Sequence, residues 1–176
     1  MISQPQSLHA QQGLGLIEVM VSVTLLSIAV LGYSALQLRA MSASEEAGQH
    51  VLAMNIARDL AERMRLNHEG MIYYRAVNQV SKACAGAAQA SQGASFCNPQ
   101  QLAEYDFELV TARAKRVGMQ LAVMDCAAMS AQRKCIYVAW GKTTATQGNN
   151  ANDCTSGARY VNNSHCIFLE TYHYVE

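Results

Sequence analysis

Residues 13–38 read GLGLIEVMVSVTLLSIAVLGYSALQL, and the fold of the whole chain is inferred outward from this stretch. It contains one charged residue, Glu18, and the first basic residue of the chain, Arg39, follows directly after it. A helix needs about 20 mainly apolar residues to cross a bilayer, so residues 14–38 are long enough to span one. The apolar run is also longer than the roughly 7–15 residues of a secretory signal peptide. The pattern therefore predicts a membrane anchor.

Glu18 is unusual in such a segment, because a carboxylate inside a membrane helix is costly and usually has a partner. Gly13 is the kind of residue that a peptidase can accommodate beside a cut. A cut after Gly13 would leave a positive amine on Leu14, one helical turn from Glu18. The amine and the carboxylate can then pair, within one chain or between neighbouring chains.

The run GLGLIE at residues 13–18, followed by an aliphatic stretch, resembles the signal of type IV pilins and type II secretion pseudopilins. The resemblance implies cleavage between Gly13 and Leu14 by a prepilin peptidase and N-methylation of the new Leu14 amine. It also implies that Glu18 guides docking of the subunit into a growing filament. The leader departs from the family pattern because it has no Lys or Arg. Leu14 and Gly15 stand where Phe and Thr are more frequent in the family.

The layout past the motif is similar to that of minor pilins of the PilV type, and the segment CIYVAWG at residues 135–141 also resembles that group. The resemblance implies an α+β, type IV pilin-like fold. In it, a long N-terminal helix, membrane-spanning in its first half, packs on a small antiparallel sheet head with disulfides. The expected parts are a leader (1–13), a transmembrane half-helix (14–38), an amphipathic half-helix (39–68) and a periplasmic α+β head (69–176).

Helical character continues beyond the apolar segment. Leu52, Ile56, Leu60 and Met64 recur every four residues, and no proline interrupts residues 14–66. A single helix of that length would be about 80 Å long. The apolar stripe predicts packing against the chain's own head. A coiled-coil stalk is the alternative, but a repeat that lasts about four turns is short for a coiled coil.

All six cysteines follow the apolar segment, which is typical of disulfides in an oxidising compartment. By the positive-inside rule, the basic residues after the span would place the C-terminal side in the cytoplasm. The cysteines argue for the opposite orientation, with the C-terminus outside, and they are given more weight. Six cysteines allow 15 connectivities, and sequence alone does not choose among them. Pairs that close small loops rich in turn-forming residues are favoured here: Cys84–Cys97, Cys126–Cys135 and Cys154–Cys166. No C-x-x-C pair or zinc-like spacing is present, so no metal site is expected.

In the head, Asn98 and Pro99 predict the start of a helix, with Asn98 as its N-cap, that ends near Gly118. Strands are expected at residues 121–124, 136–140 and 167–175, and the first two would form a hairpin clipped by Cys126–Cys135. Two long loops are expected, at residues 83–95 and 143–165. They are either binding loops or filler between filament neighbours, and the sequence leaves both open.

No catalytic constellation is found. The histidines after the leader lack a nearby Ser or Cys nucleophile signature: His50, His68, His165 and His173. Cys166, beside His165, is expected in a disulfide rather than as an activated thiol. Basic clusters at 113–116 and 133–134 could serve DNA uptake. However, 13 basic and 13 acidic residues give a net charge of zero, which argues against a protein built around phosphate contacts. We expect no enzyme, no cofactor and no nucleic-acid partner.

The chain is therefore interpreted as a minor pilin that takes part in type IV pilus assembly, in a priming or tip complex, and hence in pilus-dependent motility and adhesion. Its expected location is the inner membrane, with the C-terminal head in the periplasm, and after assembly the pilus. The expected partners are a prepilin peptidase, other minor and major pilins, the inner-membrane assembly platform, a tip adhesin and the lipid bilayer. Two alternatives are a minor pseudopilin of type II secretion and a periplasmic binding module on a permanent, uncut signal anchor.

Overall fold

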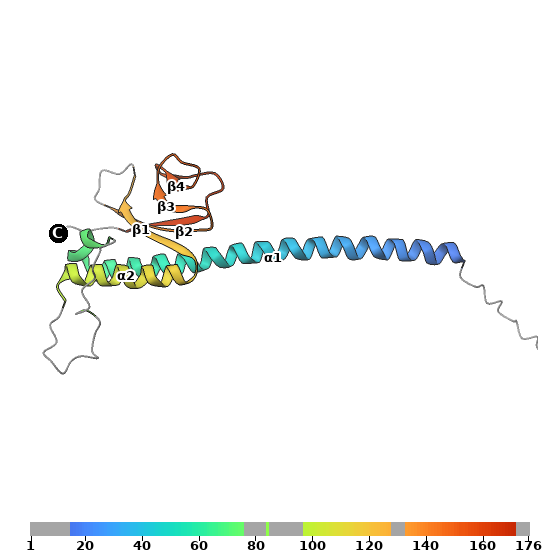
Figure 1. Cartoon of the computed structure of the whole chain (residues 1–176), viewed down its shortest axis with the longest axis horizontal. Helices are drawn as coiled ribbons and strands as arrows, with labels where there is room; N and C mark the ends of the chain where they lie inside the picture. The colour runs from blue at the N-terminus through green and yellow to red at the C-terminus, as the bar shows by residue number, and fades with distance from the viewer. Residues whose placement is uncertain (1–14, 76–83, 85–96, 128–132, 172–176) are drawn as a thin grey trace, which may run out of the picture. The chain divides into compact units, whose positions relative to one another are not determined.

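The computed structural model describes residues 15–75, 84, 97–127 and 133–171. The chain divides into two compact units, Met1–Glu46 and Ala47–Glu176, called here the apolar half and the head. One helix, α1 (Leu16–Leu66), contributes to both units (Figure 1). The long helix expected from the uninterrupted apolar and amphipathic patterns is confirmed from residue 16 onward, and the α+β class is confirmed by the head.

The part of α1 that belongs to the head buries one stripe of side chains. Ala53, Ile56, Ala57, Leu60 and Met64 are all at most 3% exposed, because their four- and three-residue spacing puts them on one face. The stripe packs against the head, so the coiled-coil stalk is not the structure. Leu52, expected to open the stripe, is 36% exposed, since the buried face begins one residue later.

Two further helices follow α1. A short 3-10 helix, η1 (His68–Tyr73), leads to α2 (Pro99–Arg116). Asn98 caps α2 as expected: its side chain accepts a hydrogen bond from the Gln101 backbone N–H (2.8 Å), and its own N–H donates to the Gln101 side chain (3.1 Å). The chain leaves α2 through Gly118, whose φ of +73° is the left-handed conformation that glycine adopts without strain.

The main sheet has three antiparallel strands in the order β1-β2-β6. They are β1 (Met119–Asp125), β2 (Lys134–Trp140) and β6 (Cys166–Thr171), which confirms the three expected strands. Residues 172–175, the expected end of the last strand, lie outside the described residues. Strand β2 is central, which agrees with its nearly continuous apolar sequence KCIYVAW, because a central strand is covered on both faces.

The prediction of a long loop at residues 143–165 is wrong. That segment forms a second three-stranded sheet from β3 (Thr144–Gln147), β4 (Asp153–Ser156) and β5 (Arg159–Tyr160). Strand β3 pairs with β4 in parallel, and β4 pairs with β5 in antiparallel orientation. The strands are short and mostly polar, so they show no apolar alternation. The other expected loop, residues 83–95, lies outside the described residues apart from Cys84.

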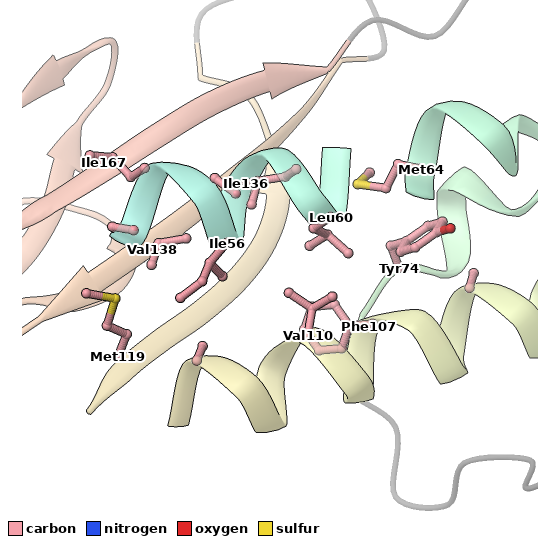
Figure 2. Packing of buried hydrophobic residues seen from close by; sticks show 14 of the residues in the cluster. Ile56, Leu60, Met64, Tyr74, Phe107, Val110, Met119, Ile136, Val138 and Ile167 are labelled. Atoms are coloured by element: carbon pink, nitrogen blue, oxygen red, sulfur yellow. The ribbon is translucent and has the colours of Figure 1, made fainter. Parts of the chain in front are cut away.

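Alternate residues of β2 point into two different cores. Ile136, Val138 and Trp140 join the buried face of α1 and the inner face of α2. Figure 2 shows this cluster, in which Ile136 and Val138 of β2 lie against Ile56 of α1. Cys135, Tyr137 and Ala139 join a second cluster with Ala145 of β3, Cys154 of β4 and Cys166 of β6. The head is thus layered, with helices on one face of the main sheet and the small sheet on the other.

Candidate functional site

The described part of the apolar half has no core of its own. Every residue from Gly15 to Glu46 is exposed, and large apolar side chains are bare, including Leu16 (79%), Leu26 (64%) and Leu31 (70%). Burying apolar surface is the dominant favourable term in folding and association. A continuous apolar surface of this extent is therefore an interaction surface, for lipid, for other helices, or for both in turn.

Length and composition make α1 the one helix in the described residues that could cross a membrane. Its most apolar window has a mean hydropathy of 2.1, none of that window is buried within the chain, and it lies near the N-terminus. Together with the signal-like motif at residues 13–18, the helix is compatible with anchoring in the inner membrane and a periplasmic head.

The four Ser and Thr hydroxyl groups between residues 15 and 38 are satisfied within the helix. Ser22, Ser27 and Ser34 each donate to the backbone carbonyl four residues earlier, at 2.7–2.8 Å. Thr24 donates to the carbonyl of Val21 at 2.8 Å. These bonds leave the helix surface effectively apolar, because the donor of each hydroxyl already has an acceptor and needs no water.

Glu18 is the one charged residue on the helix between residues 15 and 38. It lies exposed in the first turn of α1, where its backbone N–H donates to the carbonyl of Gly15 at 2.9 Å. A carboxylate at this position is favoured by the unpaired N–H groups and the positive end of the helix dipole. It also offers acceptor oxygens to a cation brought near this end. Gly13 and Leu14, the expected cleavage residues, lie outside the described residues.

The head contains an ion-pair network that sequence analysis did not single out. Arg63 of α1 pairs with Asp59 one turn before it (2.9 Å) and with Asp106 of α2 (2.6 Å). Arg113, expected in a basic cluster, is paired with Asp59. The two helices are therefore joined by alternating charges. The sequence gives no local signal for this network, because Arg63 and Asp106 are 43 residues apart and Asp59 and Arg113 are 54 residues apart.

Burial and charge shift the pKa values of Arg63 and of the neighbouring Tyr74. Burial tends to lower the pKa of Arg63, but the hydrogen bonds and charges of Asp59 and Asp106 outweigh it and raise that pKa. Burial, together with the nearby Asp106 carboxylate, raises the pKa of Tyr74 to about 12, although a hydrogen bond with Asn67 opposes the shift. Arg63 thus stays charged and Tyr74 stays neutral across the physiological range. Neither Arg63 nor Tyr74 therefore acts as a proton donor or acceptor near neutral pH.

The six cysteines form three disulfides, and they are the sequential pairs that the sequence favoured: Cys84–Cys97, Cys126–Cys135 and Cys154–Cys166. Cys126–Cys135 joins the ends of β1 and β2, with Cα atoms 5.1 Å apart, and so clips the hairpin as expected. Cys154–Cys166 joins the small sheet to the main sheet. Cys166 is therefore bonded and not a thiol activated by His165.

Asp153 organises the turn between β3 and β4. Its carboxylate accepts hydrogen bonds from the Thr146 hydroxyl (2.6 Å) and the Asn150 backbone N–H (2.8 Å). These bonds lower the pKa of Asp153, because they favour the charged carboxylate. A Cβ at Gly148 would overlap that carboxylate, so glycine permits the close approach. Polar contacts of this kind hold the small sheet where apolar alternation is missing.

Two family models match the chain. One, described as type IV pilin Tt1218 (Tt1218-like), covers residues 35–108, and the other, the prokaryotic N-terminal methylation motif, covers residues 8–34. No curated protein and no solved structure matches the chain significantly. The methylation match contains the GLGLIE run and the start of α1, and the pilin match contains the rest of α1 and the first half of α2.

These matches describe a structural subunit of a pilus or pseudopilus, and they imply other pilins and a prepilin peptidase as partners. The architecture agrees, since a long N-terminal helix packs on a small antiparallel sheet in a head with three disulfides. The two matches and this architecture together support a type IV pilin.

Proposed function

We propose that the protein is a minor pilin that takes part in type IV pilus assembly. It is inserted in the inner membrane through residues 14–38, cut after Gly13 and methylated on Leu14. It then moves from the bilayer into a priming or tip complex. The observation that carries this proposal is the apolar half of α1, which is bare along its described length and has a single charged residue, Glu18, between residues 15 and 38.

The bare helix explains why assembly can proceed without a loss of burial. In the bilayer, lipid tails cover the apolar surface, and in a filament the helices of neighbouring subunits cover it instead. Transfer between these environments exchanges one apolar partner for another. The hydroxyls bonded to their own helix, such as those of Ser22 and Ser27, add no unsatisfied donor in either setting.

Glu18 can fix the register of neighbouring helices, which apolar packing alone does not fix. Two unit charges 4 Å apart attract by about 4 kcal/mol at an effective dielectric constant of 20. Pairing of the Glu18 carboxylate with the processed Leu14 amine of a neighbour would therefore favour one register of the two helices. Registers that leave either charge unpaired among apolar groups are disfavoured by its desolvation.

The assignment to the PilV type of minor pilin rests on the head. The segment CIYVAWG, which resembles that group, coincides almost entirely with the central strand β2. A minor pseudopilin of type II secretion shares the N-terminal motif completely and is the second candidate. The six cysteines fit the pilus better. A deletion that abolishes twitching and leaves secreted enzymes unchanged supports the pilus, and the reverse supports the pseudopilus.

The Glu18 role is tested by substituting Glu18→Ala and Glu18→Gln in the full chain. We expect normal cleavage but strong loss of the subunit from sheared pili, measured by immunoblot against the membrane fraction. The matched control is Glu46→Ala, which removes an exposed acid farther along the same helix. Normal incorporation of both Glu18 variants would remove the docking role, and equal loss in the Glu46 control would show a general sensitivity of the helix.

A further inference from the structure

The inference concerns the two edge strands of the main sheet, β1 and β6, which lie on either side of β2. In an antiparallel pair, the residues of a strand direct their backbone N–H and C=O groups alternately toward the partner and away from it. An edge strand therefore presents every second residue's groups outward. Such a row is a template on which another strand can pair.

The outward row of β1 follows from one hydrogen bond at its end. The Cys126 N–H donates to the Arg133 carbonyl at 3.1 Å, which continues the register of β1 on β2 by one pair. Bonded and non-bonded pairs alternate, so Ala122 and Met124 bond to β2, whereas Leu121 and Val123 point outward. The outward N–H and C=O groups of Leu121 and Val123 form no hydrogen bond within the described part of the chain.

The opposite edge is treated differently. Phe168 of β6 points outward, because it stands opposite Tyr137, whose backbone groups bond to β1. The Phe168 N–H donates to the Tyr160 hydroxyl at 3.4 Å, and the two rings lie 5.2 Å apart. The disulfide Cys154–Cys166 ties the small sheet to the same strand. The small sheet thus supplies a partner for an outward group of β6, and β1 has no counterpart among the described residues.

Strand β1 also lacks the features that usually prevent edge pairing. Residues 119–124 read MQLAVM, with no charge, proline or glycine, and all seven residues of β1 keep one register with β2, so no bulge bends the strand. Leu121 and Val123 are partly buried at the helix-side core, and Ala122 and Met124 at the other core. Free backbone groups are therefore flanked by partly covered apolar side chains on both faces.

We propose that the outer edge of β1 takes up an extended segment of another pilus subunit as a fourth strand of the main sheet. The proposal rests on the proposed function. An extended backbone supplies donors and acceptors at the spacing of the outward row, and apolar side chains on both faces of the segment would extend the two cores. Open filaments are built from heterologous contacts, in which one surface meets a different one. The occupant is therefore not β1 of a second copy.

The experiment compares backbone hydrogen exchange of the full chain in two states, as the unassembled subunit in detergent and as the subunit in sheared pili. Fragmentation in the mass spectrometer resolves single amides. In detergent, we expect fast exchange at Leu121 and Val123 and slow exchange at Ala122 and Met124. In pili, exchange at Leu121 and Val123 should slow by about tenfold or more, while Ala122 and Met124 change little. A contact made by side chains alone would not follow this alternation.

A pair of variants removes one outward donor. Val123→Pro deletes the N–H that faces the incoming strand and leaves the bonds from β1 to β2 in place, which is where an edge strand tolerates proline. Val123→Ala is the matched control, because it shortens the same side chain and keeps the N–H. We expect the proline variant to enter sheared pili about tenfold less than the alanine variant. The unfolding midpoints of the two heads, measured in detergent, check that both are folded.

The outcomes separate this proposal from the proposed function. A subunit that is present in pili, but whose Leu121 and Val123 amides exchange as fast there as in detergent, overturns strand addition and leaves the pilus role standing. Equal incorporation of the two folded variants also overturns it. Slow exchange already in detergent overturns the assignment to another subunit: a dimeric mass assigns the edge to a second copy, and a monomeric mass to a segment of the same chain. A chain that is absent from sheared pili overturns the proposed function and the inference together.

Discussion

The two halves of α1 share one continuous helix and yet bury their side chains in opposite ways. From residue 16 to 46 every side chain is exposed, whereas from Ala53 to Met64 a stripe is almost completely buried by the head. The head half is stabilised within the chain, as in any folded domain. The apolar half buries no apolar surface against its own chain. The favourable free energy of covering that surface must therefore come from lipid or from other subunits. The same secondary structure thus serves folding in one half and association in the other.

The sharpest test of this contrast is a pair of identical substitutions in the two halves. Leu60→Ala deletes a side chain that is 0% exposed and should lower the free energy of unfolding of the head by about 2–5 kcal/mol. Leu36→Ala, at a site that is 67% exposed, should change it by less than about 0.5 kcal/mol. Denaturant unfolding in detergent, followed by Trp140 fluorescence, measures both. Equal losses would mean that the two halves unfold as one unit.

A second test asks how much the head depends on its covalent links. Replacing Cys154 and Cys166 together by Ser removes the bond between the small sheet and the main sheet. The loss should be about 3 kcal/mol, because the unfolded chain gains the freedom of a loop of this size. The same unfolding curve, measured on the oxidised wild type and on the variant, gives the difference. An unchanged midpoint would show that polar contacts alone hold the small sheet.

The ion-pair network gives a smaller expected effect. Asp106 is 6% exposed, and Asp106→Asn would leave Arg63 with Asp59 alone. We expect a loss of about 1–3 kcal/mol, the usual range when a partly buried polar group loses its partner. Glu108→Gln is the control, because Glu108 is exposed on the same helix. If both variants were equally stable, the joining of α1 to α2 would be attributed to apolar packing.

The smallest effect concerns pH and the turn at Asp153. The pKa of this carboxyl is lower in the folded protein than in the unfolded chain, where it is about 3.9. Its contribution to stability is therefore fully present above pH 4 and is lost as the pH falls through the folded value. Asp153→Asn should flatten the acid side of the stability curve and leave its slope above pH 5 unchanged. A persistent acid slope in the variant would assign it to other carboxyls.

Much of the fold was predictable because its signals are local. The uninterrupted apolar run, the four-residue stripe and the Asn98-Pro99 start each depend on neighbours within a few residues. The strands of the main sheet were expected for the same reason, since Ile136, Val138 and Trp140 alternate with Tyr137 and Ala139 in an apolar run. Both faces of such a run must be covered, and the structure covers them with two different cores.

The small sheet was not predicted because no apolar alternation in the sequence marks its strands. Strands β3 and β4 are mostly polar, and they are held by the Asp153 hydrogen bonds and by the disulfide to Cys166. The Asp59–Arg63–Asp106 network was missed for a related reason. Its members read as ordinary surface charges on two amphipathic helices, and only the antiparallel docking of α2 brings them together.

The candidate site, too, could be predicted from the sequence only in part. Glu18 stands out in the sequence as the one charge in an apolar run. Arg113 belongs to the same sequence cluster as Arg116 and yet is committed to an internal ion pair. Sequence clusters of charge therefore do not separate structural from available cations.

The most direct test of the account is the mass of the N-terminal peptide. The protein would be purified from membranes of cells with and without the prepilin peptidase. The account predicts a chain that begins at methylated Leu14 only when the peptidase is present, and a chain that retains residues 1–13 when it is absent. A chain that retains residues 1–13 in both strains would contradict it, and would make the apolar half of α1 a permanent anchor instead of an assembly surface.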